Sequence, residues 1–142
     1  MMKNIGRFPP VVDRDEQDGK RYEKLRSALQ IEEKELQHKD IFLFALSYGF
    51  STNVKIDIKK KVTGGFFRSE TFSSEDLALI KAVAISSTGE NVLNNPSLIL
   101  DIAEKYAHGG IIELEKIIDD MQFGSFSKYL EGMVMKNFSE EK

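Results

Sequence analysis

The sequence predicts a mainly α single domain, in which five or six helices pack around a central apolar helix at about residues 39–48, with one small antiparallel β-hairpin at about 54–70. Three observations predict this fold class. An unbroken apolar run at Ile41–Leu46 gives the central helix side chains to bury on most of its circumference. Apolar residues recur at spacings of three and four on both sides of that run. Between Val54 and Ile58 the apolar period falls to two, which is the repeat of a half-buried strand.

Cap residues, acidic first turns and glycines mark the ends of the expected helices. We expect helices at about 13–29, 39–48, 73–89, 95–108, 111–121 and 129–134. Gly49 is expected to end the central helix, and the stretch His108-Gly109-Gly110 is expected to separate the fourth helix from the fifth.

The hairpin prediction depends on a turn at Gly64-Gly65. A tight turn there would place Lys61 opposite Arg68 on adjacent strands. One face of the hairpin would then be basic, with the side chains of Lys55, Lys59, Lys61 and Arg68. We expect an extended N-terminal arm over 1–12, because Pro9-Pro10 disfavours a helix, and a frayed tail over 137–142.

Composition narrows the class of protein. The 142 residues suit one domain and include no cysteine, which excludes disulfides and thiolate metal sites and fits a reducing compartment. The apolar run Ile41–Leu46 is far too short to cross a bilayer, and the first residues lack a signal-peptide core. We therefore expect a cytoplasmic protein that does not insert into a membrane.

Charge is unevenly distributed along the chain. Residues 38–68 hold six basic and two acidic residues, whereas residues 69–142 hold six basic and thirteen acidic ones, and the whole chain has a net charge of −3. The basic middle segment suggests contact with an anionic partner.

The sequence shows no pattern typical of a catalytic or metal site, and we expect a protein that is not an enzyme and holds no cofactor. His38 and His108 are seventy residues apart without an acidic partner at a metal-ligand spacing, and we interpret each as a solvated or helix-capping side chain. The pairs Asp119-Asp120 and Glu113/Glu115 are interpreted as a solvated helix face, because side chains so close in a helix do not converge.

The basic segment has two interpretations. Its cations could neutralise DNA phosphates without reading sequence, and the candidate contacts are Lys55, Lys59, Lys60, Lys61 and Arg68. Alternatively, lysines on the solvent side of an edge hairpin discourage strand-to-strand aggregation. The acidity of the whole chain, with a pI of about 5.5, argues against a dedicated nucleic-acid binder.

Five short stretches of the chain share one resemblance. They are Arg14-Asp15-Glu16, Lys39–Phe50, Thr71–Ala78, Ser87–Glu90 and Ile102–Ile111. Together these stretches resemble the small dnd system-associated proteins. That family accompanies bacterial and archaeal gene clusters for DNA phosphorothioate modification and restriction. The resemblance implies a non-enzymatic accessory role in phage defence, through a protein partner and with DNA contact as an addition, but it carries over no catalytic residue. The alternative is a stand-alone helical interaction module that binds a partner protein or a second copy of itself.

Overall fold

A computed structural model of the chain describes residues 7–29 and 35–121. These residues form four α-helices, α1 (Gly19–Leu29), α2 (His38–Ser51), α3 (Ser74–Thr88) and α4 (Pro96–Asp119). Two short strands, β1 (Val11–Val12) and β2 (Phe67–Arg68), form one antiparallel sheet, and 3₁₀ turns lie at η2 (Glu16–Asp18), η3 (Ser69–Thr71) and η4 (Glu90–Asn94). The predicted mainly helical class with one small antiparallel sheet is confirmed.

The predicted count of five or six helices is not confirmed. The fourth and fifth predicted helices are one continuous helix, α4, in the described chain. The sixth predicted helix at 129–134, the tail at 137–142 and the first six residues of the arm lie outside the described residues.

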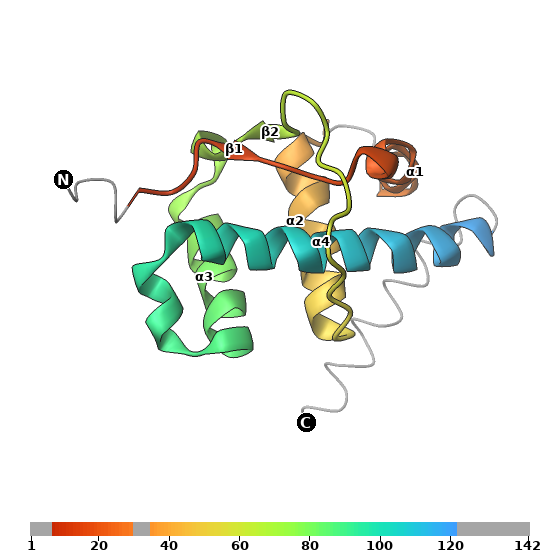
Figure 1. Ribbon diagram of the computed structural model, residues 1–142. Coiled ribbons are helices and arrows are strands. Elements are labelled where there is room, and N and C mark those ends of the chain that lie inside the picture. Colours follow the sequence, from red (N-terminus) through yellow and green to blue (C-terminus); the bar gives the residue numbers. More distant parts are fainter. Residues whose placement is uncertain (1–6, 30–34, 122–142) are drawn as a thin grey trace.

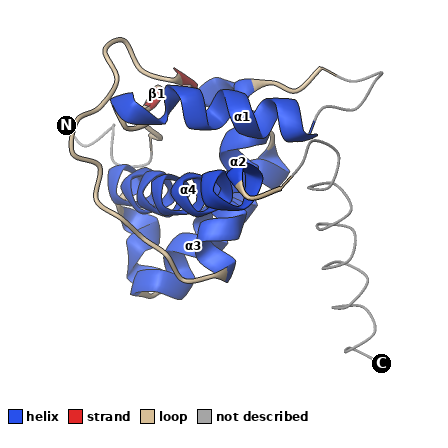
Figure 2. Ribbon diagram, turned by 90° about the vertical axis from the view of Figure 1, so that its right-hand side faces the viewer, coloured by secondary structure: helices blue, strands red, loops and turns tan. Residues whose placement is uncertain are grey.

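The long helix α4 crosses the whole molecule and organises the packing (Figure 1). It contacts α1, α2 and α3, and its most extensive contact is with α2. Figure 2 shows α1 over one side of α4 and α3 on the opposite side. The predicted central helix, α2, does bury Ile41, Phe42, Ala45 and Leu46. However, the helix on which the other three described helices pack is α4, because its buried positions continue from Ile99 to Leu114.

Three glycines allow α2 and its following segment to pack directly against α4. A Cβ atom on Gly110 would lie 1.9 Å from the carbonyl oxygen of Ala45, and one on Gly49 would lie 2.0 Å from that of Tyr106. A Cβ atom on Gly109 would lie 2.3 Å from the carbonyl oxygen of Val54. The predicted helix ends at Gly49 and at His108-Gly109-Gly110 are therefore wrong. These glycines permit close approach of two backbones instead of ending a helix.

The predicted β-hairpin at 54–70 is wrong in its pairing. The turn at Gly64-Gly65 does form, but its two limbs bond to the N-terminal arm rather than to each other. Val11 pairs with Arg68 and Val12 with Phe67 in the sheet. On the other limb, the Val62 N–H donates to the Arg14 carbonyl oxygen at 3.0 Å. The arm is already extended at Pro9-Pro10 and buries Val12 completely, so it competes well as a strand partner.

Residues 54–58 keep the predicted alternation without forming a strand. Val54, Ile56 and Ile58 are half-buried, whereas Lys55 and Asp57 are exposed. The segment is extended and crosses α4 (Figure 1), where the Ile56 N–H donates to the carbonyl oxygen of Lys105 at 3.1 Å. The apolar period of two therefore indicates a half-buried extended segment. Here that segment packs against a helix and not against another strand.

Candidate functional site

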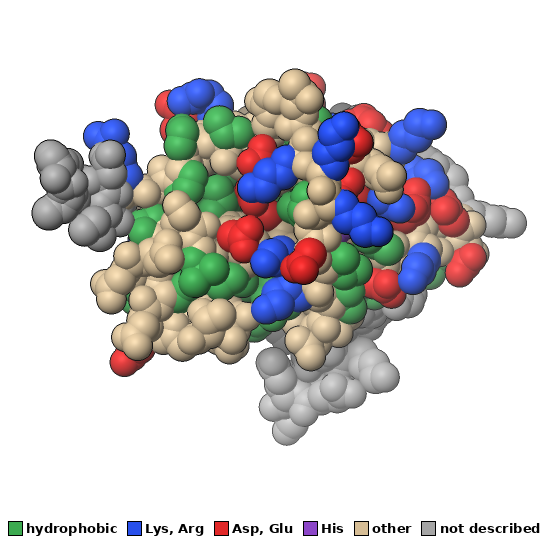
Figure 3. All heavy atoms as spheres, in the orientation of Figure 1, with side chains coloured by type: hydrophobic (Ala, Val, Ile, Leu, Met, Phe, Trp, Pro, Cys, Tyr) green, Lys and Arg blue, Asp and Glu red, His purple; other side chains and the backbone are tan. Residues whose placement is uncertain are grey.

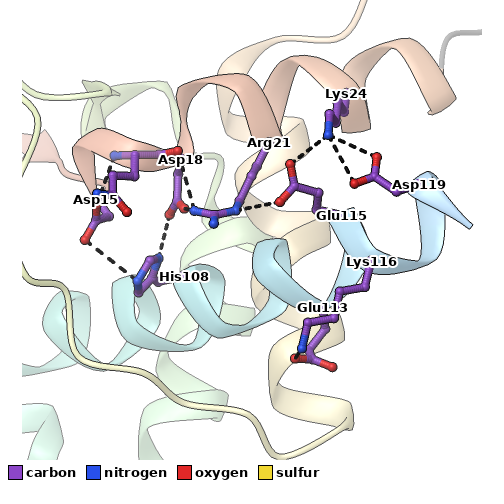
Figure 4. A network of polar contacts seen from close by, with 10 residues as sticks. Asp15, Asp18, Arg21, Lys24, His108, Glu113, Glu115, Lys116 and Asp119 are labelled. Carbon is purple, nitrogen blue, oxygen red and sulfur yellow. Dashed lines mark hydrogen bonds and ion pairs between the residues drawn. The ribbon is translucent and has the colours of Figure 1, made fainter.

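A chain of charged side chains, termed the polar seam, joins the N-terminal segment to α4 (Figure 4). Its members are Asp15, Asp18, Arg21, Lys24, His108, Glu115 and Asp119. The Nδ1 atom of His108 lies 2.7 Å from Asp18 Oδ2, and Arg21 donates to Asp18 Oδ1 at 2.9 Å. Arg21 also donates to Glu115 at 2.9 Å. The seam thus fixes η2 and α1 against one side of α4.

The buried end of the seam contains His108, Asp15 and Asp18, each at most 7 % exposed. The expectation that His108 is a solvated or capping side chain is therefore wrong. Its ring lies in the middle of α4, where it faces two carboxylates from a segment about ninety residues earlier in the sequence. A buried carboxylate needs such partners, because an unpaired charge away from water is costly.

Asp15 connects the seam to the loop before Gly64. Its carboxylate accepts the backbone N–H of Gln17 at 2.9 Å and that of Lys59 at 3.1 Å. Burial raises the pKa of Asp15, but these hydrogen bonds and the nearby charge of His108 outweigh that effect and lower its pKa below the ordinary value. Asp15 therefore stays ionised, and its carboxylate holds the backbone at Gln17 and at Lys59 in place.

A groove of about 520 Å³, termed the arm groove, lies between the N-terminal arm and the start of α4. Its lining residues are Pro9, Val11, Asp13, Lys61, Asn95, Ser97, Leu98, Leu100, Asp101 and Glu104. On the arm, alternate residues face the groove, as expected for an extended chain. Figure 3 shows hydrophobic side chains on the left part of the visible face, and mixed basic and acidic side chains across the middle of that face.

Glu104 is the most unusual residue of the arm groove. Its side chain is 3 % exposed, and its Oε2 accepts the backbone N–H of Asp13 at 2.7 Å. The Lys61 ammonium lies 3.7 Å from Glu104 Oε1. Burial raises the pKa of Glu104 to about 7, although the Asp13 N–H and the charge of Lys61 act in the opposite direction. Glu104 therefore changes its charge near neutral pH.

The five predicted DNA-contact residues do not share one hairpin face, and most have local partners. Lys60 pairs with Glu16 at 3.7 Å, Lys61 with Asp13 at 3.5 Å, and Arg68 with Glu70 at 2.6 Å. Lys55 lies over the ring of Tyr106, and Lys59 contributes its backbone N–H to Asp15. Much of the positive charge of residues 38–68 is thus neutralised by acidic residues nearby.

The predicted solvated acidic pairs divide between two environments. Glu115 is half-buried and accepts from both Arg21 and Lys24, and the Lys24 bond is the largest cause that lowers its pKa. Asp119 also bonds to Lys24, at 3.0 Å. Glu113 makes only a local pair with Lys116 on α4. The expectation of a solvated face is therefore wrong for Glu115.

Sequence reasoning missed Glu104, Asp15 and Asp18. One signal was present: Glu104 and His108 are four residues apart, so they share a face of a helix whose neighbouring positions, such as Ile102 and Ala103, are apolar. Two ionisable residues within an apolar stripe indicate buried partners. The identity of those partners depends on the tertiary fold.

Among residues 7–29 and 35–121, no group of three or more His, Asp or Glu side chains is placed to hold a metal ion. Within the same ranges, no helix has the length and apolar character needed to cross a membrane. Comparison of the chain with protein-family models, with curated proteins and with solved structures finds no match. The resemblance to the small dnd system-associated proteins therefore stays a prediction.

Proposed function

We propose that this chain is a non-enzymatic accessory protein of a DNA-modification and phage-defence system, and that it acts by binding another protein. The sequence resemblance described above supports the connection with DNA phosphorothioation. The observation that carries the protein-binding part is the arm groove, in which apolar side chains on both walls, among them Val11 and Leu98, lie beside a larger number of polar and charged ones. Protein–protein interfaces are as a whole about as apolar as the rest of a protein surface, so a groove of this mixed character suits a protein partner.

Charge pairing favours a protein partner over DNA. A phosphate backbone attracts unpaired cations, but Lys60, Lys61 and Arg68 each have an acidic neighbour. The net charge of −3 adds a general repulsion from DNA. DNA contact through Lys55, Lys59, Lys60, Lys61 and Arg68 is therefore an addition to the proposal, which protein binding does not require.

The proposal is tested by biolayer interferometry, with the immobilised full chain and each purified enzyme of a phosphorothioation system in turn. Leu98→Asp places a charge in the arm groove. Leu79→Asp, on α3, is the matched control, because the two leucines are 39 % and 40 % exposed. We expect one enzyme to bind, with affinity reduced about tenfold or more by Leu98→Asp and unchanged by Leu79→Asp. Absence of binding by every enzyme would contradict the proposal.

The second candidate is a helical interaction module that binds a second copy of itself. It is favoured by three exposed leucines, Leu79, Leu93 and Leu98, on α3, η4 and α4. Light scattering after size-exclusion chromatography should then show a dimer fraction that grows with protein concentration and falls in Leu93→Asp. Monomer alone at high concentration would contradict this candidate.

A further inference from the structure

One wall of the arm groove is an extended segment and the opposite wall is a helix. Pro9, Val11 and Asp13 line it from the extended arm, at a spacing of two. The opposite wall is the first two to three turns of α4, from which Ser97, Leu98, Leu100, Asp101 and Glu104 line the groove. A partner segment in extended conformation also presents alternate side chains to one side, so it matches the arm wall in spacing.

The charges in the groove are predominantly negative. Asp13, Asp101 and Glu104 supply carboxylates, and Lys61 supplies the single cation among the lining residues. Asp101 is already paired with Lys105 of its own helix, at 3.1 Å. The start of a helix favours anions, but Asn95 already caps α4 by accepting the Leu98 N–H. Asp13 and Glu104 therefore face the ammonium of Lys61 alone, and charge complementarity favours a cationic ligand group between these two carboxylates.

The Lys61 ammonium occupies the place that such a group would take. It lies 3.5 Å from Asp13 Oδ2 and 3.7 Å from Glu104 Oε1, and both distances exceed those of a direct hydrogen bond. Its side chain remains 54 % exposed, so it can leave the groove without crossing packed side chains. Lys61 is thus a loosely held internal cation between two carboxylates.

We propose that the arm groove binds an extended basic segment of a partner protein, and that an arginine or lysine of this segment replaces Lys61 between Asp13 and Glu104. This inference rests on the proposed protein-binding function and names the chemistry of the partner. The guanidinium group of arginine fits best, because its planar fork donates to two carboxylates at once. The apolar wall at Val11 and Leu98 accepts the hydrophobic residues that alternate with the cation.

The test uses three blocked hexapeptides, in which leucine alternates with arginine, with the neutral isostere citrulline, or with glutamate. Binding to the full-length protein is followed by methyl NMR of Leu98 and Val11. We expect the arginine peptide to shift these signals at concentrations about fivefold lower than the citrulline peptide, and the glutamate peptide to leave them unchanged. Equal binding by the arginine and citrulline peptides, or no binding by either, would overturn the inference.

Variants separate a direct contact from general damage to the fold. Asp13→Asn and Glu104→Gln should each weaken arginine-peptide binding several-fold, whereas Glu75→Gln, at an exposed carboxylate on α3, should not change it. Lys61→Ala should strengthen binding about threefold, because the internal competitor is gone. A damaged fold would not produce such a gain. Unchanged or weaker binding by Lys61→Ala would overturn the replacement step.

The pH dependence gives an additional readout. Glu104 interacts with Asp13 from the N-terminal segment, Lys61 from the loop, Tyr22 from α1 and Asp101 from its own helix. Because the Glu104 carboxyl ionises near pH 7, arginine-peptide binding should be tighter at pH 8 than at pH 6, and Glu104→Gln should remove the difference. If the enzymes bind in a Leu98-dependent manner while the peptides show no charge preference, the proposed function stands and this inference fails. If no enzyme binds but the peptides bind as expected, the arm groove does bind a basic segment and the proposed function fails.

Discussion

His108 and Glu104 lie one helical turn apart on α4 and fasten the same N-terminal segment at two points. His108 contacts Asp18 and Asp15, and Glu104 accepts the Asp13 N–H. Each side chain is almost completely buried, so each depends on its partners to offset the loss of water. At the scale of single residues, these contacts set the position of the arm and hence the shape of the arm groove.

Replacement of His108 by alanine should lower the free energy of unfolding by about 2–4 kcal/mol, because it leaves buried carboxylates short of a partner. The matched control is Glu113→Ala on the same helix, whose ion pair with Lys116 is exposed and should contribute less than about 0.5 kcal/mol. Urea denaturation measures both. Equal, small effects would show that the buried end of the seam does not stabilise the fold.

Glu104 should make stability depend on pH. Burial raises its pKa from 4.5 to about 7 in the folded chain, so between these values the folded state binds more protons than the unfolded state. The free energy of unfolding therefore falls as pH rises from about 4 to about 7.5. Glu104→Gln, which still accepts the Asp13 N–H, should be more stable than wild type by about 1–3 kcal/mol at pH 8 and equal to it below about pH 4. A difference that does not change with pH, measured by urea denaturation, would contradict this prediction.

At the scale of elements, the crossing of α2 and α4 depends on glycine rather than on apolar surface alone. Gly110→Ala should destabilise the protein by about 3 kcal/mol, because the new Cβ would lie 1.9 Å from the Ala45 carbonyl oxygen. The usual effect of this substitution within a helix has the opposite sign, a gain of about 1 kcal/mol. Gly19→Ala on α1 is the control: its Cβ would lie 3.4 Å from the end of the Arg14 side chain, and no loss is expected. Thermal denaturation of the two variants and of the wild type measures both effects. A Gly110→Ala protein as stable as the wild type would contradict the close crossing of α2 and α4.

Individual elements also differ in how well the sequence predicts them. The helix α3 was predictable because its signals are local: Ser73 accepts the Asp76 N–H at its start, and Gly89 has a φ of +97° at its end. The continuity of α4 was not predictable. In the sequence alone, Gly109-Gly110 is typical of a helix end, and only the tertiary fold shows that the backbone of α2 passes beside Gly110. The sheet was predicted with the wrong partner for a similar reason. The turn at Gly64-Gly65 is local, but the competition between strand partners is decided by the burial of Val12 in the tertiary fold.

For the whole molecule, the distribution of charge matters more than its sum. The basic residues of the middle segment suggested an anionic partner, but the fold brings Glu16 of η2 next to Lys60 and Asp13 next to Lys61. The arm groove could not be predicted from sequence patterns, because its lining residues come from three separate stretches, 9–13, 61 and 95–104. The path of the arm alongside the start of α4, with the turn at Gly64-Gly65 packed beside it, brings these three stretches together.

Internal pairing of the cations predicts weak contact with DNA. Fluorescence anisotropy of labelled duplexes, plain and phosphorothioate-modified, should show no binding at about 0.15 M salt. The triple variant Lys59→Glu, Lys61→Glu and Arg68→Glu should behave in the same way. Salt-sensitive binding by the wild type that the triple variant loses would instead make these residues a DNA-contact surface.

One ratio of affinities shows whether the arm groove contacts a partner protein. The dissociation constant of Leu98→Asp for the bound phosphorothioation enzyme is divided by that of Leu79→Asp, measured by biolayer interferometry with the full chain. We expect a ratio of about ten or more, because of these two leucines only Leu98 lines the arm groove. A ratio near one, with both variants folded, would contradict this expectation.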